Sequence, residues 1–445
     1  MFYPHWDVPR IGGGLVIALI ATVHILIAHF AVGAGLFIAL TESRLARRPD
    51  PLLRDFLQRF GRFVVLFSFV AGALTGVGIW FSIGLVAPRA TSILIHNFVW
   101  GWAAEWALFI LEIAAGYVYY YNFDRLSERR RRAAAWIYAL AAWGSLVIIN
   151  GILSFMLTPG RWLATHGFWD GFFNPTYWPS LVLRTISSLS LAGIFVAIVA
   201  NAARAYSREQ ARHIINHAAW FLAPLMLMIP AAVWFFAEVP AEPRRLVMGA
   251  AIAMNLFFMF GVATSTLIGF YAFIGLIWNK RYVNMETAIL LAAIAFIATG
   301  SMEFVREGIR KPYLIYDYLY SNNWTTEETL AHGHESVLAA NAWVLPAGRG
   351  AASLTPLELG RAVYQAQCSQ CHNLNGVNDV KQLVAYWDEK LIWSNLQDIH
   401  RLKSYMPPLV GTDAERRALA KFLLSLNESS PAGAMASHDG LKGQF

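Results

Sequence analysis

Long apolar runs separated by short polar segments dominate the chain up to Arg306. Each run has the roughly 20 residues that an α-helix needs to cross a bilayer. The pattern therefore predicts an all-α fold, a polytopic membrane helix bundle with about eight transmembrane helices. The runs cover residues 13–41, 62–87, 95–121, 133–157, 178–203, 214–237, 246–278 and 286–306.

The pattern changes after the eighth run. Residues 313–352 are polar and read as a linker, and an amphipathic helix follows near the end of the chain, from Asp413 to Leu426. Thr158–Trp178, inside the bundle, is aromatic and rich in Gly and Pro, which favours a surface or interfacial lid over a helix. The expected domains are a membrane bundle at 1–312, the linker, a second domain at 353–430 and a flexible tail at 431–445.

Charge adds an orientation to this bundle. The chain is 57% apolar and 14% charged, with a mean hydropathy of +0.45 and a net charge of +7. This is a membrane composition, and the basic residues lie between the runs, which argues against a nucleic-acid surface. Odd-numbered connections carry sixteen Lys and Arg residues, including Lys280 and Arg281, and even-numbered ones carry four. The positive-inside rule then places the N-terminus and the C-terminal domain on the periplasmic side of a bacterial inner membrane.

The chemistry of the C-terminal domain is indicated by Cys368-Ser369-Gln370-Cys371-His372, which reads C-x-x-C-H. Two thiols at this spacing can each bond a haem vinyl group while the adjacent histidine reaches the iron, so the pattern predicts one covalent haem c. A redox C-x-x-C pair and half of a zinc site are the alternatives. Neither explains the adjacent histidine, and the chain has only two cysteines.

The sixth ligand of this iron is expected at Met406, within Tyr405-Met406-Pro407-Pro408. Met opposite His is the usual cytochrome c pair and raises the haem potential. A plain core thioether is the alternative. With a helix leading into the haem motif and an amphipathic helix closing the domain, the segment from about Leu354 to Leu426 resembles a class I cytochrome c.

Ionisable side chains within the apolar runs are the candidates for a membrane site, because a charge in lipid is costly. His24 lies midway along the first run and reads as a haem ligand or as a core histidine bonded to a carbonyl. His29 lies about 140° further round the same helix, so both cannot face one iron. His213 and His217 have metal-ligand spacing, but no third ligand lies near them in sequence, which disfavours a metal site.

Two pairs of glutamates complete the membrane candidates. Glu105 and Glu112 are seven residues apart in the third run and share one helix face, which suggests a proton path or haem ligands. A buried salt bridge with Arg184 is the alternative. Glu303 and Glu307 lie one turn apart at the outer end of the eighth run, where a solvated charge cluster is the alternative to a site.

Taken together, the bundle resembles subunit I of the cytochrome bd-type quinol oxidases. Three segments carry the resemblance: Thr22-Val23-His24-Ile25-Leu26, then Leu111-Glu112 followed by Asp124-Arg125-Leu126, and Glu307-Gly308-Ile309-Arg310-Lys311-Pro312-Tyr313. The resemblance implies that His24 and Glu307 are haem-iron ligands and that Glu105 and Glu112 serve proton delivery or the dihaem site. It also implies non-covalent haem b, haem d or both in the membrane.

Two features depart from that family. Arg184 stands where the family's low-spin haem b needs a histidine. The connection at Glu238–Leu246 is much shorter than the family's quinol-binding loop. We therefore expect the quinol site and its first electron acceptor to be lost, with the fused cytochrome c supplying electrons instead. This combination resembles the bd-like proteins with a haem c domain found in some bacteria.

The first hypothesis is a membrane-bound haem electron-transfer enzyme, a bd-like terminal oxidase that receives electrons through haem c and reduces oxygen at a buried haem. Glu105 and Glu112 would carry protons from the cytoplasmic side. The second is a non-catalytic electron-transfer subunit, and the third is a quinone-linked dehydrogenase anchor. Expected partners are the membrane, a periplasmic redox protein or complex and, by resemblance, a second membrane subunit, with no nucleic acid.

Overall fold

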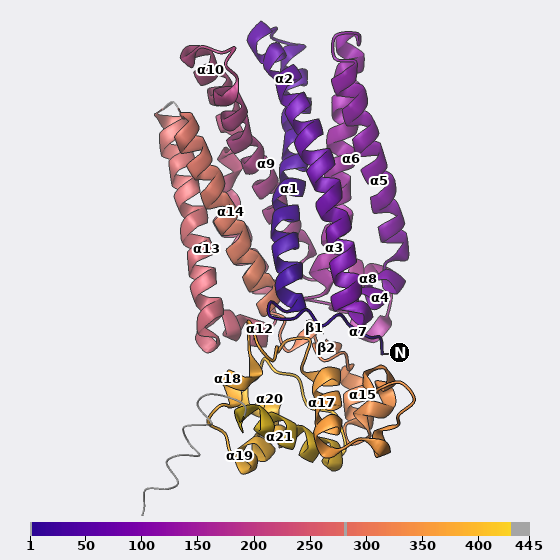
Figure 1. The fold of residues 1–445 in the computed structure, drawn as a ribbon. Helices are drawn as coiled ribbons and strands as arrows, with labels where there is room; N and C mark the ends of the chain where they lie inside the picture. Colours follow the sequence, from indigo (N-terminus) through magenta and orange to yellow (C-terminus); the bar gives the residue numbers. More distant parts are fainter. Residues whose placement is uncertain (1, 280–282, 429–445) are drawn as a thin grey trace, which may run out of the picture. The chain divides into compact units, whose positions relative to one another are not determined.

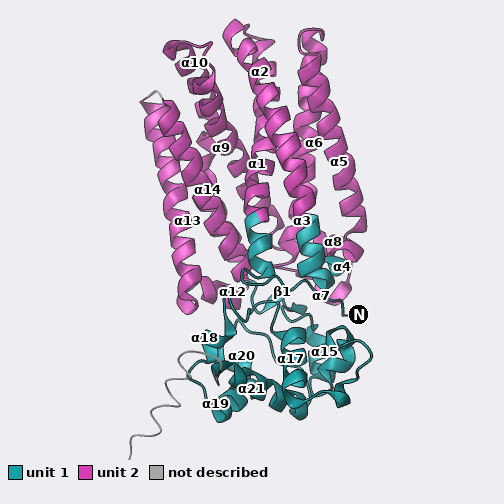
Figure 2. Ribbon diagram, in the orientation of Figure 1, with its two compact units in different colours: residues 1–19, 80–93, 310–445 teal, residues 20–79, 94–309 magenta. Residues whose placement is uncertain are grey.

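The computed structural model describes residues 2–279 and 283–428, in two compact units. Figure 2 colours unit 1, which comprises 1–19, 80–93 and 310–445, and unit 2, which comprises 20–79 and 94–309. The predicted basic residues Lys280 and Arg281 and the predicted tail at 431–445 lie outside the described residues.

The predicted all-α membrane bundle is confirmed. Within the described residues, eight helical stretches are long and apolar enough to cross a membrane. Many of their large apolar side chains are exposed, among them Leu74 and Ile252, as lipid-facing side chains would be. The stretches are α1 (Gly13–Leu45); α2 (Pro51–Val64), η1 (Val65–Ala71) and α3 (Gly72–Val86); α5 (Val99–Tyr121); α6 (Glu128–Phe155); α9 (Tyr177–Ala202); α10 (Arg208–Ala218), η2 (Ala219–Phe221), η3 (Ala223–Leu227) and α11 (Met228–Glu238); α13 (Ile252–Phe270) with η5 (Tyr271–Trp278); and α14 (Met285–Gly308).

Polar residues at the helix starts explain where several of these stretches begin. The Asp50 side chain accepts hydrogen bonds from the backbone of Leu52 and Leu53, and Pro51 occupies the first turn. This cap starts α2 eleven residues before the apolar run at 62–87, because its first turns are amphipathic. The third stretch, in contrast, begins later than its apolar run at 95–121, because the first residues of that run belong to a separate helix, α4 (Pro88–Asn97).

Antiparallel neighbours build the bundle in unit 2. There α5 packs along α6, α13 along α14, and α9 against both α10 and α14. Figure 1 shows the connections after α1, α5 and α9 at one end of this unit. Those connections carry most of the basic residues counted in the sequence, so the charge asymmetry lies between the two ends of the bundle.

The segment expected to be a lid instead forms two short helices, α7 (Trp162–Thr165) and α8 (Phe168–Phe172). The expectation of a non-helical segment was wrong, because its aromatic residues find buried partners: Trp162 packs edge-on against Phe155 at 4.9 Å. Asn174 then ties the segment to the bundle, since its side-chain amide donates to the carbonyl of Gly151 at 3.2 Å.

Unit 1 contains the C-terminal domain. The hairpin of β1 (Tyr313–Ile315) and β2 (Leu319–Tyr320) leads into helices that share one core, and Trp324, Val337 and Leu338 from residues 313–352 are buried in that core. The structure therefore folds the segment predicted as a linker onto this domain. The helices of this domain are α15 (Thr326–His332), α16 (Val337–Ala340), η6 (Ala342–Val344), η7 (Ala351–Ser353), α17 (Pro356–Gln367), α18 (Val380–Val384), α19 (Glu389–Gln397), α20 (Ile399–Leu402) and α21 (Asp413–Glu428).

The connection between α11 and α13 belongs to unit 2. It consists of α12 (Ala241–Arg245) and η4 (Leu246–Ala250).

The crossing of α17 and α21 sets the frame of this domain. At the crossing, a Cβ on Gly360 would lie 2.1 Å from the carbonyl oxygen of Ala418, so only glycine allows this approach. Tyr364 and Phe422 pack beside it with ring centroids 5.6 Å apart. The end of α17, where the C-x-x-C-H segment begins, is thereby held in place.

Candidate functional site

The C-x-x-C-H segment forms a tight turn at the end of α17. The backbone N–H of Cys368 donates to the carbonyl of Tyr364 at 2.8 Å, which closes the helix. The N–H groups of Cys371 and His372 then both donate to the carbonyl of Cys368, at 3.1 and 2.9 Å. Both thiols and the imidazole are therefore carried by one compact turn.

The electrostatics of this turn fit a covalently bound haem. Burial raises the pKa of the Cys368 thiol to about 12 and lowers the pKa of His372, although the nearby carbonyl of Asn378 partly opposes the second effect. A neutral imidazole is the form that binds iron. In the described part of the chain, both cysteines are free and the buried Nδ1 of His372 has no well-formed hydrogen bond. These groups match the thiols and the ligand that haem c requires.

The loop that carries Met406 is fastened beside this turn. Gln367, the last residue of α17, accepts from the N–H of Val410 at 3.1 Å and donates to the carbonyl of the same residue. Within the loop, the carbonyl of Met406 lies 2.6 Å from His400 Nδ1. The fold therefore brings the loop of Met406 to the end of the helix from which Cys368 follows.

His24 in α1 is bonded to Thr75 in α3, with 3.0 Å between His24 Nδ1 and Thr75 Oγ1. The Thr75 hydroxyl donates its own proton to the carbonyl of Ala71 at 2.7 Å, so its oxygen accepts from His24. This assigns the hydrogen to Nδ1 and leaves a lone pair on Nε2. Within the described residues Nε2 has no hydrogen-bond partner, which is the condition a metal-ligating histidine needs.

His29 lies in the same helix and is also buried. It is within electrostatic reach of His24 and of Arg184. Arg184 in turn is close to Glu303 and Arg306. Glu105 accepts a hydrogen bond from Ser145 at 2.9 Å. Among the described residues, the predicted alternative of an ion pair between Arg184 and Glu105 is not seen.

Glu105 and Glu112 belong to a longer row on α5. Glu112 is buried and interacts electrostatically with Glu105. Seven residues beyond Glu112, the same helix face presents Tyr119, about 10 Å further along the axis. The Tyr119 hydroxyl donates to Glu42 at 2.9 Å. Tyr119 was not predicted from the sequence as a third member of this row, although the seven-residue spacing could have revealed it.

Glu42 is the centre of a buried ionic network at one end of the bundle. Arg131 Nε and Nη2 donate to the two oxygens of Glu42, at 2.7 and 3.1 Å. Both side chains are at most 3% exposed. Arg131 was predicted only as one of the basic residues of a connection, since nothing in a run of four arginines marks the one that turns inward.

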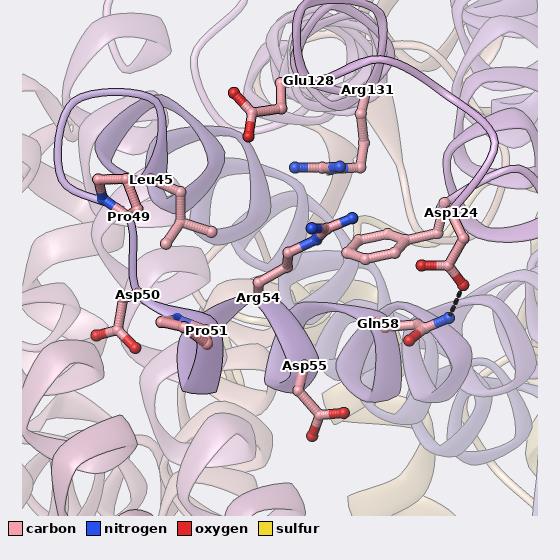
Figure 3. Close-up of a pocket in the computed structure, with 11 residues that line it drawn as sticks. Leu45, Pro49, Asp50, Pro51, Arg54, Asp55, Gln58, Asp124, Glu128 and Arg131 are labelled. Carbon is pink, nitrogen blue, oxygen red and sulfur yellow. Dashed lines mark hydrogen bonds between the residues drawn. The ribbon is translucent and has the colours of Figure 1, made fainter.

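A cavity of about 330 Å³ opens beside this network, and Arg131 is part of its lining. Figure 3 shows the lining as a mixture of cationic and acidic groups, with Gln58 donating to Asp124 at 2.8 Å. The cavity lies at the connections between α1 and α2 and between α5 and α6. Its labelled residues are Leu45, Pro49, Asp50, Pro51, Arg54, Asp55, Gln58, Asp124, Glu128 and Arg131.

The remaining candidates lie elsewhere in the bundle. Glu307 is in the last turn of α14, where it interacts electrostatically with Arg306. His213 pairs with Asp50 at 2.8 Å, and His217 lies 3.0 Å from the Thr41 hydroxyl. These contacts join α10 to the cap of α2 and to α1. Among the described residues, no group of three or more His, Cys, Asp or Glu side chains could hold a metal ion.

Comparison with known proteins identifies the bundle. The family model described as cytochrome bd terminal oxidase subunit I matches residues 15–252, more than half of the chain. The chain belongs to this family. The model described as cytochrome C oxidase, cbb3-type, subunit III matches residues 355–423, so a cytochrome c domain is fused to the subunit I bundle.

Among solved structures, the bd oxidase from Geobacillus thermodenitrificans matches with a TM-score of 0.55 and 16% sequence identity, over 67% of this chain and 86% of that chain. At that identity the match shows a shared fold. No curated protein matches the sequence. Membership of the bd family together with a cytochrome c domain supports a membrane protein that binds haem and transfers electrons. The matched ranges include every candidate ligand except Glu307, which lies beyond residue 252.

Proposed function

We propose that this protein is a bd-like oxidase that accepts electrons through a covalent haem c and reduces oxygen at a haem buried in the bundle. The observation that carries the proposal is the bond between His24 and Thr75. In a member of the bd family, it leaves His24 Nε2 unpaired within the bundle. His24 is partly buried, and an imidazole whose other nitrogen is held by a hydrogen bond is the form in which histidine binds a metal ion.

Each candidate group then has a defined task. His24 holds one membrane iron, and Thr75 fixes the tautomer and ring orientation that expose its Nε2. Glu307 holds a second iron through its carboxylate. Cys368 and Cys371 anchor haem c, and His372 and Met406 bind its iron. The haems supply one-electron chemistry and, at the open membrane iron, a site for oxygen.

Protons for oxygen reduction reach the bundle from the cytoplasmic side. The cavity lined by Arg131 provides the opening, and the Glu42–Tyr119 contact leads from it to the face of α5 that carries Glu112 and then Glu105. Protons are handed inward along this row, Glu112 first. Ser145 holds the Glu105 carboxylate in position through its hydrogen bond.

The bundle supports electron input from a protein rather than a quinol. Only two residues separate α11, which ends at Glu238, from α12, which begins at Ala241, and this leaves no room for a quinol-binding loop. With an even number of spans, the N-terminus and the cytochrome c domain lie on the same side, the periplasmic side by the positive-inside rule. A periplasmic redox protein is therefore the electron donor, and a second membrane subunit completes the complex.

Haem quantification of the purified protein tests this function. Pyridine haemochrome spectra should give one haem c per chain together with haem b or haem d. Carbon monoxide added to the reduced protein should shift the spectrum of a membrane haem. Haem c with only low-spin, CO-insensitive membrane haem would instead support a non-catalytic electron-transfer subunit, and haem c alone would refute haem binding by the bundle.

A further inference from the structure

The segment at 2–12, here called the N-terminal strap, packs against the haem motif inside unit 1. His5 Nε2 lies 2.8 Å from the hydroxyl of Ser369, the residue directly after Cys368. The His5 ring also packs edge-on against Trp343, with centroids 5.0 Å apart. These two contacts hold the strap against the middle of the C-x-x-C-H turn.

The loop that follows the haem motif closes on the other end of the strap. The backbone N–H of Val377 donates to the carbonyl of Arg10 at 2.6 Å. A Cβ on Gly376 would lie 1.9 Å from that same carbonyl oxygen, so any other residue here would push the strap away. Gly12 faces the side chain of Asn373. Helix α1 begins at the next residue, Gly13.

The end of α3 and the start of α4 belong to the same contact. The N–H of Trp6 donates to the carbonyl of Leu85 at 2.8 Å, and the side-chain amide of Gln370, inside the haem motif, reaches the carbonyl of Val86. Arg89 lies over the ring of Phe2 at 4.4 Å and pairs with Glu328 at 2.6 Å. The strap therefore lies between the haem motif and the helix ends that begin α1 and finish α3.

We propose that the strap is an intramolecular docking interface that fixes haem c at the ends of α1 and α3 and sets the route by which electrons enter the bundle. This inference rests on the proposed function. With haem bound at both sites, Cys368, Cys371 and His372 would hold the one-electron donor and His24 would hold the one-electron acceptor. The electron that is passed on is replaced by a one-electron donor protein in the periplasm. Because the chain itself covers this face of the haem motif, that donor docks on another face of the domain.

Two variants are designed to release the strap while the haem ligands stay unchanged. Gly376→Val places a side chain against Arg10 and releases the strap without altering a haem ligand. Gly350→Val is its matched control, because a Cβ on Gly350 meets nothing within 4 Å. A second route to the same release is the double variant Phe2→Ala, His5→Ala, which removes two side-chain anchors from outside the haem motif.

Each variant is purified as the full chain and is characterised by five measurements. Haem staining and the haem c midpoint potential check that haem c is intact. Deuterium exchange at the N–H groups of Trp6 and Val377 reports whether the strap is docked. The rate of electron transfer from haem c to the membrane haem is followed after CO is removed by a light flash from the fully reduced protein in the presence of oxygen, which oxidises the membrane haem. External reduction of haem c by ascorbate is measured as a separate rate.

In the native protein and in Gly350→Val, both amides should be protected and electron transfer should be equally fast. Release of the strap should slow that internal step by roughly tenfold or more, since small misplacements of reacting groups are costly in rate, while ascorbate reduces haem c at an unchanged rate. Unchanged transfer in a variant whose amides exchange freely would overturn the inference alone. Unprotected amides in the native protein would also overturn it. If the native protein showed no internal transfer despite a docked strap, the proposed function would fail as well.

Discussion

His24 Nδ1 and Thr75 Oγ1 lie 3.0 Å apart, and this bond joins α1, the first membrane-spanning stretch, to α3 in the second. Because Thr75 also donates to the carbonyl of Ala71, the direction of the bond is fixed and Nε2 of His24 is left as the free nitrogen. Gly76 lets α3 pack closely against this ring, because a Cβ at that position would lie 3.2 Å from His24 Cε1. The hydroxyl of Thr75 thus fixes the orientation and the tautomer of the His24 ring.

Replacing Thr75 with Val should weaken binding of the membrane haem by about tenfold to a hundredfold, as loss of an outer partner does for other metal-ligating histidines. Thr75→Ser keeps the hydroxyl and should keep the haem. The ratio of haem b or d to haem c in the purified variants measures this effect. Equal ratios in the Val and Ser variants would remove Thr75 from the site.

The two histidines of α1 should respond differently to substitution. His24→Ala should lose non-covalent haem while haem c stays attached, and His29→Ala should keep both. His29 is buried, but it lies on another face of the helix and near the positive charge of Arg184. Loss of the membrane haem from His29→Ala alone would show that the register assigned to α1 is wrong.

Met406→Ala should leave haem c covalently attached and lower its reduction potential, because a thioether ligand favours the reduced iron. A redox titration of haem c gives the potential, and the far-red sulfur-to-iron absorption reports the ligand directly. As a control, Tyr405→Ala changes the exposed neighbour without touching the thioether. Absorption and potential that match the native protein would identify another sixth ligand.

The buried pair of Glu42 and Arg131 should matter far more for stability than an exposed pair. Arg131→Leu leaves a buried carboxylate without its cation and should cost about 3–5 kcal/mol. The matched control is Arg59→Leu, because the Arg59–Asp55 pair is 48% and 44% exposed and exposed pairs contribute at most about 1 kcal/mol. Thermal unfolding in detergent compares the two variants, and similar losses would contradict the assignment.

Docking of the strap should weaken in acid. Burial lowers the pKa of His5 from 6.5 to about 4, so between these values the released strap binds more protons than the docked one. Protection of the Trp6 and Val377 amides should therefore fall as pH drops from 6.5 to 4. Burial raises the pKa of Asp7 and acts in the opposite sense, so the comparison is made with His5→Gln. An equally steep fall in that variant would exclude His5 as the cause.

The sequence predicted the bundle well because each span is an apolar run long enough to cross a bilayer, a property of composition alone. Helix ends were less predictable where a polar cap such as Asp50 begins an amphipathic turn before the apolar run. The fold of residues 313–352 was not foreseen, since its few buried residues, such as Trp324, meet partners that are distant in sequence.

Candidate ligands could be found from residue type and spacing, as Cys368, Cys371 and His372 illustrate. Their supporting residues could not. Thr75 reads as an ordinary polar residue in an apolar run, and only its contact across to α1 reveals its relation to His24. Likewise, the strap precedes the first span and has no motif, so its contact with Ser369 required the fold.

The central claim is that electrons from haem c reach an oxygen-reactive haem within this chain. The most direct measurement starts from the fully reduced, CO-bound protein, removes CO with a light flash in the presence of oxygen, and follows haem c by its absorption. The account predicts that a membrane haem releases CO and reacts with oxygen, and that haem c is then oxidised within the same turnover. Haem c that stays reduced, or the lack of any photolysable CO adduct, would contradict it.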